Sequence, residues 1–546
     1  MRLALASIAL AVLAGCATVP TEPVKVKILA INDFHGNLKP PTGGIRIQDP
    51  ADRTKTVNVP AGGAEHLATA VAELRAKNPN HVFVAAGDLI GATPLVSALF
   101  RDEPTIESLS AMGLEASAVG NHEFDKGATE LVRMQRGGCA GDDTCRGPAP
   151  FKGAAFNYLA ASTVDTKSGQ TLFPAYFVKR FQGIPVAFIG LTLKGTPSIV
   201  VPSGVAGLNF RDEAETVNEL VPQLKAQGIE AIVLLIHEGG IPTGDYNECP
   251  GISGPIVDIV KKLDKAVDLV ISGHTHRAYN CRIDGRLVTS GDKYGTIVTQ
   301  IDLTLDPKTK DVTSATADNV IVRTASFAKD PRQTELIAAY ERLAVPLAKR
   351  VVGRLGGALS RDIAPNGEMP IGQVIADAQL DATRDAGAQL ALMNPGGIRA
   401  PLAMPADGQL RYEDLFSTQP FYNNLVTMTL TGAQLVQVLE QQWTAQASPR
   451  LLQVSKGFTY TWDNAKPAGQ KVVPGSLRLN GQAIGPDTRV RVTVNGFLAG
   501  GGDNFTALKQ GSDTRTGMMD IDALERWVKA NPGLVPGAPD RIQRLN

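Results

Sequence analysis

Short apolar runs alternate with helical patterns and with glycine- and proline-rich loops from Lys25 to about Phe327. Apolar runs of this length, bounded by turn residues, are typical of buried strands in an α/β domain. The pattern therefore predicts an α/β domain over residues 25–328. Five of its runs stop abruptly at polar residues, and three more are expected to be scaffold strands: Pro185–Leu191, Arg286–Ser290 and Thr296–Leu305.

The pattern changes after residue 328. Leucines and alanines recur at helical spacing behind Asp330, an expected N-cap, and predict a linking helix over residues 329–350. Beyond it, Met369–Asp385 is expected to be a helix and Gln389–Met393 a strand. We therefore predict a second, C-terminal domain over residues 351–546, a segment that contains no histidine.

Residues 1–16 are interpreted as a lipoprotein signal and residues 17–24 as a tether. Arg2 precedes an apolar stretch, Leu3–Leu13, that is shorter than the roughly 20 residues a membrane-spanning helix needs. The stretch closes on the letters LAGC, with Cys16 as the lipidated residue. We expect an exported protein that meets the membrane through this lipid, in the periplasm, outer membrane or cell surface. The alternative is an ordinary secretory signal that happens to contain a cysteine.

The composition is that of a soluble globular protein, with 43% hydrophobic and 20% charged residues. Basic and acidic residues are equal at 54 each, so the formal net charge is zero. The sequence has no block rich in lysine or arginine. Tight electrostatic binding of long nucleic acid is therefore not expected.

Four further cysteines follow Cys16, and an even number in an exported chain favours disulfides. Cys139 and Cys145 bracket a short loop, which predicts a local bridge. Cys249 and Cys281 each follow one of the polar strand ends, and a bridge between them would staple these loops. Four thiolates on one metal is the alternative, but the spacings do not match a zinc site.

Metal-ligand residue types gather at the five polar strand ends. Each of these strand ends is a turn or loop, which is where the functional residues of an α/β sheet usually lie. The GNHEFD motif alone would also fit an Asx turn or a helix cap. Five of the seven histidines fall within these strand ends. Together they predict a metal centre, from the motifs NDFHG at Asn32, GD at Gly87, GNHEFD at Gly120, HEGG at His237 and GHTH at Gly273.

The donors are carboxylates, imidazoles and one side-chain amide, which suit two divalent ions of Zn, Mn, Co or Mg. Asp88 lies between the other donors in chain order and is expected to bridge the two ions. Two ions about 3.5–4 Å apart polarise both the attacking and the leaving oxygen of a displacement at phosphorus. The first ion would take Asp33, His35, Asp88 and His276, and the second Asp88, Asn121, His237 and His274.

His122 is left without a metal, and Asp125 stands three residues later. On the first turn of a helix this spacing places both side chains on one face, so Asp125 would orient the imidazole and favour its charged form. We predict that Asn121 and His122 stabilise developing charge and that His122 is a candidate general acid. The alternative is that Asp125 is only an acidic residue at a helix N-terminus.

Loops of the C-terminal half hold the candidate substrate-binding residues. The expected strand Gln389–Met393 runs into a glycine turn with Asn394 and Arg399, and arginine suits a phosphate or carboxylate. Phe421 and Phe497 lie in two loops with polar neighbours, where two rings would sandwich a planar base. The alternative for each phenylalanine is an ordinary core position.

The ordered set NDFHG, GDLIGATP, GNHEFD, HEGG and GHTH resembles the calcineurin-like metallophosphoesterases, and within them the bacterial 5'-nucleotidase branch. The resemblance spans nearly all of the mature chain. It implies an N-terminal four-layer α/β/β/α sandwich, a C-terminal α+β nucleotide-binding domain, and attack on phosphorus by a hydroxide between two metals. It also implies the substrate contacts: Phe421 and Phe497 on the base, Asn423 and Asp503 on base or ribose, and Asn394 and Arg399 on the phosphate side.

The C-terminal half departs from the family pattern. Gln373 stands where the family's Gly-Asn-Leu-Ile segment has asparagine, and Pro395 interrupts the family's Asn-Gly-Gly-Gly turn. Members often place arginines shortly before the helix at Gly372, where this chain has only Arg361. The preference for 5'-monophosphates is therefore open.

The expected activity is that of an exported 5'-nucleotidase, which releases nucleoside and phosphate. A 2',3'-cyclic-nucleotide phosphodiesterase with 3'-nucleotidase activity, or a UDP-sugar hydrolase, would use the same site. A catalytically dead surface binding protein is the alternative from another class. The sequence leaves the oligomeric state and the identity of the metal open.

Overall fold

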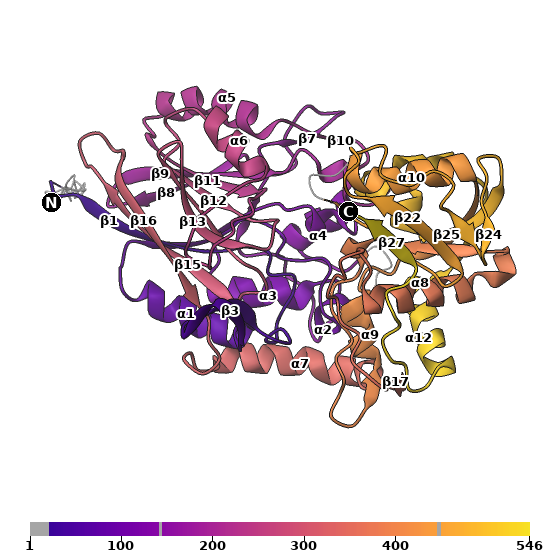
Figure 1. The fold of residues 1–546 in the computed structure, drawn as a ribbon. Helices are drawn as coiled ribbons and strands as arrows, with labels where there is room; N and C mark the ends of the chain where they lie inside the picture. The colour runs from indigo at the N-terminus through magenta and orange to yellow at the C-terminus, as the bar shows by residue number, and fades with distance from the viewer. Residues whose placement is uncertain (1–20, 141–144, 445–448) are drawn as a thin grey trace, which may run out of the picture.

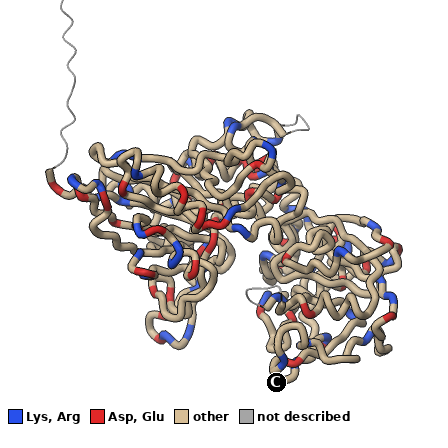
Figure 2. Tube along the Cα trace, turned by 90° about the horizontal axis from the view of Figure 1, so that it is seen from above, with Lys and Arg blue, Asp and Glu red and all other residues tan. Residues whose placement is uncertain are grey.

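The computed structural model describes residues 21–140, 145–444 and 449–546, so the expected signal and Cys16 lie outside the described residues. Two lobes lie side by side, with the N-terminal lobe in indigo to pink and the C-terminal lobe in orange to yellow (Figure 1). The view from above shows the same two lobes, with basic and acidic residues interspersed over both (Figure 2). Among the described residues, no helix combines the length and hydropathy needed to cross a membrane.

Two six-stranded sheets form the N-terminal lobe. The first has the order β16-β15-β1-β4-β5-β6 and the second β13-β14-β12-β11-β9-β8. Strands β1, β4, β5 and β6 run parallel in the first sheet, as do β9, β11, β12 and β14 in the second. The bounds in the first sheet are β1 Val24–Ile31, β4 His81–Ala85, β5 Ala116–Ala118, β6 Asn157–Leu159, β15 Ile297–Leu305 and β16 Val312–Ile321. In the second sheet they are β8 Tyr176–Phe181, β9 Ile184–Thr192, β11 Ala231–His237, β12 Leu269–Ser272, β13 Ala278–Ile283 and β14 Arg286–Gly291.

Three apolar cores show that this lobe has four layers. Residues such as Ile28 and Val84 from the first sheet pack against Phe188 and Leu235 from the second, which forms the central core. The outer face of the first sheet is covered by α1 and α3, and that of the second by α5 and α6. The predicted α/β/β/α sandwich is therefore confirmed, with α1 Ala64–Arg75, α3 Glu103–Met112, α5 Glu213–Ala226 and α6 Pro255–Lys262.

Every strand predicted from an apolar run is present, with ends within about two residues, as expected for such boundaries. The hairpin of β2 Ile45–Asp49 and β3 Asp52–Val59 was not predicted from the sequence. Its second strand is mostly polar and exposed, so no apolar run marks it.

The C-terminal lobe is built on a five-stranded mixed sheet with the order β21-β18-β25-β20-β26. One face packs on α8 and α12, and the other on α10, which gives two apolar cores. The predicted helix and strand appear as α8 Pro370–Ala382 and β18 Leu390–Met393. The remaining bounds are β20 Asn424–Thr431, β21 Gln453–Val454, β25 Arg489–Asn495, β26 Ser512–Met519, α10 Gly432–Thr444 and α12 Asp520–Ala530.

Helix α7, Pro331–Ala348, connects the lobes along the lower edge of Figure 1. The Asp330 side chain accepts hydrogen bonds from Arg332 and Gln333 N–H groups, as an N-cap does. The helix contacts α1 and α3 in one lobe and α9, Tyr412–Thr418, in the other. The predicted helix is therefore present, and Pro346 lies inside it near its end.

Both predicted disulfides are present. Cys139–Cys145 closes a loop with a sequence separation of 6, and Cys249–Cys281 one with a separation of 32. A cross-link lowers the entropy of the unfolded chain more when it closes a longer loop.

We expect the double variant Cys249→Ser/Cys281→Ser to lose about 4 kcal/mol of unfolding free energy, against about 2 kcal/mol for Cys139→Ser/Cys145→Ser. Denaturant unfolding of the three proteins under matched conditions measures the difference. An equal loss in both variants would contradict this order.

Candidate metal centre

The five polar motifs meet at one edge of the sandwich, because parallel neighbouring strands end on the same side. Asp33 follows β1, Asp88 follows β4 and Asn121 follows β5, all from the first sheet. His237 is the last residue of β11, and His274 follows β12 in the second sheet. Backbone hydrogen bonds join neighbouring loops, from Asp33 N to the Gly87 carbonyl and from His35 N to the Asp88 carbonyl, both 3.0 Å.

Five of the predicted ligands have left-handed backbone conformations. Strained conformations of this kind collect at functional sites, where the surrounding structure holds them. The side chains of these five residues therefore extend toward the donor clusters from tight loops, not from the regular part of the strands. The φ angles are 49° for Asp33, 45° for His35, 51° for Asp88, 69° for His274 and 54° for His276.

The first donor cluster contains Asp33, His35 and His276. His35 Nε2 lies 3.1 Å from His276 Nε2, and His276 Nε2 lies 3.2 Å from Asp33 Oδ1. The His35 Nδ1–H donates to the Gly91 carbonyl at 2.8 Å, because a carbonyl only accepts. The Nε2 lone pair of His35 therefore points into the cluster.

The second donor cluster contains Asp88, His237 and His274. His237 Nδ1 donates to the Ala86 carbonyl at 2.7 Å, which directs Nε2 at Asp88 Oδ2, 3.0 Å away. The same Asp88 oxygen lies 3.6 Å from His35 Nε2 in the first cluster. Asp88 thus faces both clusters, as a bridging carboxylate must.

These clusters fit divalent cations. Atoms that share an ion at bond lengths of about 2.0–2.2 Å lie roughly 3.0–3.5 Å apart, which matches the separations of His35, His276 and Asp33 donors. Asn121 Oδ1 is buried and accepts no hydrogen bond from the described residues. The donor set is nitrogen and oxygen only, which suits Zn, Mn, Co or Mg better than thiolate-binding ions.

The electrostatics of the clusters agree with this fit. Burial lowers the pKa of His274 to about 4 and that of His35 and His276 well below the usual range, so all three imidazoles are neutral and could each donate a lone pair to a metal. Burial also lowers the pKa of His237, but the adjacent Asp88 charge raises it to about 10. The space between His237 and Asp88 therefore attracts a positive charge.

Glu123 is a residue of the site to which the sequence analysis assigned no role, although it lies within the GNHEFD motif. Its carboxylate accepts the N–H groups of Asp88 at 3.0 Å, Leu89 at 2.8 Å and Gly120 at 2.7 Å. These bonds hold the loops after β4 and β5 against each other. Asn32 acts similarly between the ends of β1 and β14, since its Nδ2 donates to the Asp292 carbonyl and its Oδ1 accepts from the Gly291 N–H, both at 2.7 Å.

His122 and Asp125 lie beside the clusters and belong to neither. His122 Nδ1 and Asp125 Oδ2 are 2.8 Å apart on a 3₁₀ turn, His122–Phe124. Burial lowers the pKa of His122, but Asp125 and Asp88 raise it overall. Asp125 caps no helix here, because α4, Ala128–Arg136, starts after Gly127 without a side-chain cap.

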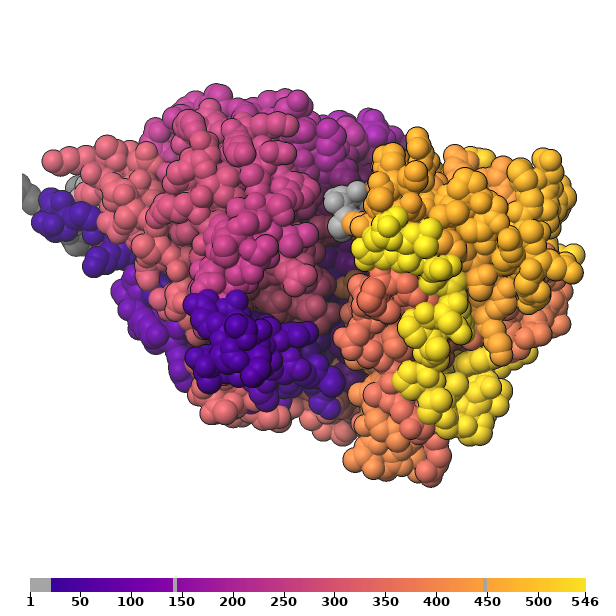
Figure 3. All heavy atoms as spheres, in the orientation of Figure 1, coloured from indigo at the N-terminus to yellow at the C-terminus, as the bar shows by residue number. Residues whose placement is uncertain are grey.

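A cavity of about 720 Å³ joins these residues to the C-terminal lobe. The space-filling view shows where the two lobes face each other (Figure 3). Asp88, Asn121 and His122 line the cavity from one lobe. From the other lobe, all six predicted substrate-binding residues line it: Asn394, Arg399, Phe421, Asn423, Phe497 and Asp503.

Hydrogen bonds order the C-terminal wall. Asn394 Nδ2 donates to Asp503 Oδ2 at 2.8 Å, and Asn394 Oδ1 accepts from Asn495 Nδ2 at 2.9 Å. Arg450, which no motif marked, lines the cavity and pairs with Asp503. Arg399 keeps Nε and Nη2 without an acceptor among the described residues.

Phe421 stands at the junction of the two lobes. Its ring lies 5.9 Å from that of His122 at an interplanar angle of 22°, and the Arg399 guanidinium lies 5.9 Å from its centroid. Arg361 Nη1 donates to the Arg399 carbonyl at 3.2 Å, so this lone arginine lies next to Arg399.

Comparisons with known proteins agree with the two-lobed arrangement. The family model for the calcineurin-like phosphoesterase matches residues 26–278, and that for the 5'-nucleotidase C-terminal domain matches residues 351–510. The solved structure of a 5'-nucleotidase precursor from Thermus thermophilus superposes with a TM-score of 0.78 at 26% identity, covering 96% of this chain and 100% of that chain.

Two curated relatives align over most of the chain. Endonuclease YhcR of Bacillus subtilis is 32% identical over 94% of this chain, which spans only 40% of that protein's length. Cell wall protein Lmo0130 of Listeria monocytogenes is 30% identical over 93% of this chain and 67% of that protein.

We expect Asp88→Ala to remove both metal ions, because its carboxylate faces both clusters, whereas Asp33→Ala should remove only one. Mass spectrometry of the metal content after dialysis against limiting Mn²⁺ measures this. Equal metal content in the two variants would contradict the bridging position of Asp88.

Proposed function

We propose that this protein is an exported 5'-nucleotidase. Its chain belongs to the calcineurin-like phosphoesterases with a 5'-nucleotidase C-terminal domain, and it is therefore a metal-dependent phosphoester hydrolase. Its substrate is a nucleoside 5'-monophosphate, and its products are nucleoside and phosphate.

The shared cavity carries this proposal. A volume of about 720 Å³ lies within the range of small-molecule sites. The N-terminal lobe lines it with donors that suit divalent ions, and the C-terminal lobe with two phenylalanines and polar neighbours. A ligand that carries both an anionic group and a planar apolar group matches this lining, and a nucleotide is such a ligand.

The phosphate end has positive groups beside the donor clusters. Nε and Nη2 of Arg399, for which the described part of the chain offers no acceptor, suit two phosphate oxygens, since a guanidinium binds such oxygens in pairs. Asn121 and His122 line the same part of the cavity. These three residues would bind the phosphate and offset its charge as the transition state forms.

Two bound divalent ions would supply the Lewis acidity and the activated water for attack on phosphorus. Hydrolysis breaks the bond between phosphorus and the ribose 5'-oxygen, which must gain a proton. His122 carries a raised pKa and is oriented by Asp125, so it is placed to donate that proton.

Phosphodiester cleavage is the second candidate. The observation that favours it is the relative named Endonuclease YhcR, which aligns with 94% of this chain. The lone Arg361, where the family often has more arginines, weakens the case for monophosphates. A 2',3'-cyclic nucleotide or a nucleotide sugar would use the same donor clusters.

Export is part of the proposal. Two disulfides suit an oxidising compartment, and one relative is named a cell wall protein. Lipid on Cys16 would anchor the protein at the membrane, with the substrate encountered outside the cytoplasm.

The function is tested with metal-stripped protein, a panel of substrates, and Mn, Zn, Co or Mg added back. Inorganic phosphate is measured for the monophosphates, p-nitrophenol for bis-p-nitrophenyl phosphate, and the separated products for 2',3'-cyclic AMP and UDP-glucose. We expect metal-dependent turnover of 5'-AMP that exceeds that of 3'-AMP, 2',3'-cyclic AMP, UDP-glucose and bis-p-nitrophenyl phosphate. Turnover of the cyclic or diester substrates alone would overturn the 5'-nucleotidase assignment and retain the metal site. Metal binding without any turnover would favour a binding protein.

Nucleoside recognition is tested with Phe497→Ala. A Phe421 variant is less suitable, because Phe421 also contacts His122. Stacking is worth about 1–3 kcal/mol per base, so KM for 5'-AMP should rise about 5- to 100-fold. Bis-p-nitrophenyl phosphate, which has no nucleoside, should be hydrolysed by this variant as by the wild type.

We expect Asp125→Asn to lower kcat for 5'-AMP about 100-fold, because the imidazole loses the charge that orients and protonates it. The number of metal ions per chain should stay at the wild-type value, since Asp125 is in neither cluster. Loss of metal together with activity would show that Asp125 supports the metal loops instead.

A further inference from the structure

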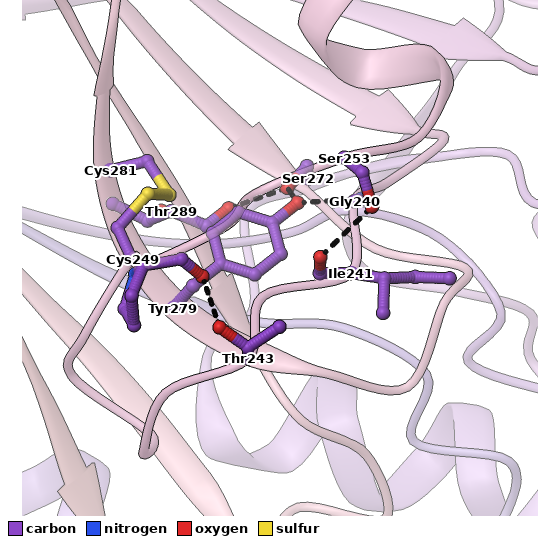
Figure 4. Close-up of a disulfide and its surroundings, with 10 residues drawn as sticks. Gly240, Ile241, Thr243, Cys249, Ser253, Ser272, Tyr279, Cys281 and Thr289 are labelled. Atoms are coloured by element: carbon purple, nitrogen blue, oxygen red, sulfur yellow. Dashed lines mark hydrogen bonds between the residues drawn. A yellow bond between two sulfur atoms is a disulfide. The ribbon is translucent and has the colours of Figure 1, made fainter.

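Tyr279 lies beneath the two histidine-bearing loops of the second sheet and is fully buried (Figure 4). Its hydroxyl is 3.1 Å from Gly240 N and 2.7 Å from Ser272 Oγ. Ser272 Oγ is in turn 2.7 Å from the Thr289 carbonyl. The hydroxyl groups of Tyr279 and Ser272 therefore connect four segments of the polypeptide: the loop that contains Gly240 and strands β12, β13 and β14.

The direction of this hydrogen-bond chain follows from the atoms. The Thr289 carbonyl only accepts, so the single Ser272 proton is donated to it. Ser272 Oγ must then accept the Tyr279 proton, and the Tyr279 oxygen accepts from the Gly240 N–H. Burial raises the pKa of Tyr279 to about 12, so the hydroxyl keeps its proton.

Two members of this series of hydrogen bonds, Gly240 and Ser272, lie close in sequence to predicted metal ligands. Gly240 follows His237 by three residues, and Ser272 precedes His274 by two. A second bond joins the same loops, from Thr275 Oγ1 to the Gly240 carbonyl at 2.8 Å. The backbones also touch, since a Cβ on Gly239 would lie 2.2 Å from the Gly273 carbonyl oxygen.

The disulfide fixes the far end of the same loop. Cys281 lies two residues beyond Tyr279 on β13, on the same face, and is bonded to Cys249. Ile241 pairs with Ser253 across the loop base, and both line the cavity. Strand β13 thus holds the loop at both ends.

We propose that Tyr279 is a positioning residue: its hydroxyl sets the position of His237 relative to His274 and thereby the metal affinity of the second cluster. The proposal rests on the metal-dependent activity. Tyr279 itself lines no part of the cavity. Residues that orient metal ligands in this way typically change metal affinity or activity 10- to 100-fold when mutated.

The competing view is that Tyr279 serves only as an apolar core residue, since its ring belongs to the core of the second sheet. Tyr279→Phe separates the two views because it keeps the ring and removes the hydroxyl. The matched control is Tyr460→Phe, another buried tyrosine whose hydroxyl lies 3.3 Å from Gln442 Nε2 in the other lobe.

The test titrates Mn²⁺ into metal-stripped, full-length protein by calorimetry and compares the two variants with the wild type. We expect Tyr279→Phe to weaken one of two Mn²⁺ sites about 10- to 100-fold, with kcat restored at saturating Mn²⁺ and the substrate KM unchanged. In metal-free protein, hydrogen exchange over Glu238–Ile241 should be faster. Tyr460→Phe should match the wild type in all three measurements.

Wild-type Mn²⁺ affinity together with wild-type exchange at Glu238–Ile241 in Tyr279→Phe would overturn the proposal. If Tyr279→Phe does not fold, Ser272→Ala breaks the next link and is judged by the same criteria. Where both single variants fold, the double variant should lose no more Mn²⁺ affinity than the single variant with the lower affinity, because both residues act through one series of hydrogen bonds. Loss of turnover with intact Mn²⁺ binding would contradict the positioning role but leave the 5'-nucleotidase proposal standing.

Discussion

The buried carboxylate of Asp88 is the group on which the rest of the structure depends. Its Oδ2 lies 3.6 Å from an imidazole of the first sheet and 3.0 Å from one of the second. A buried carboxylate is costly unless positive charge faces it on several sides. The arrangement therefore exists only when the two sheets are packed face to face with their strand ends aligned.

The strand ends hold ligands in left-handed backbone conformations, which are unfavourable unless neighbouring groups support them. Side chains that are not ligands provide this support. Glu123 accepts three backbone N–H groups between two loops of the first sheet, and Tyr279 joins two loops of the second. Each sheet thus has its own polar residue that fixes the loops above it.

Substrate recognition is assigned to a separate lobe, which the cavity brings against the metal centre. Phe421 stacks near His122 although the two residues are about 300 positions apart and come from different lobes. In the proposed function, binding of the nucleoside and chemistry at phosphorus are coupled through this contact between lobes. A change in the contact would then alter both substrate affinity and the orientation of the leaving group.

The sequence by itself determined the strands that precede the polar motifs, the linking helix, the metal-ligand motifs and the aromatic loops, because apolar runs and residue types are local properties. Neighbouring parallel strands end on one edge, so the gathering of Asp33, Asp88 and Asn121 from β1, β4 and β5 was predictable. The roles of Glu123, Tyr279 and Arg450 were not, since each depends on partners that are distant in the chain or on backbone amides without a sequence signal. The polar hairpin at residues 45–59 lacked an apolar run and was missed. Only the packing of two sheets and two lobes decided these contacts, because hydrogen-bond partners across a core are selected by geometry rather than by residue type.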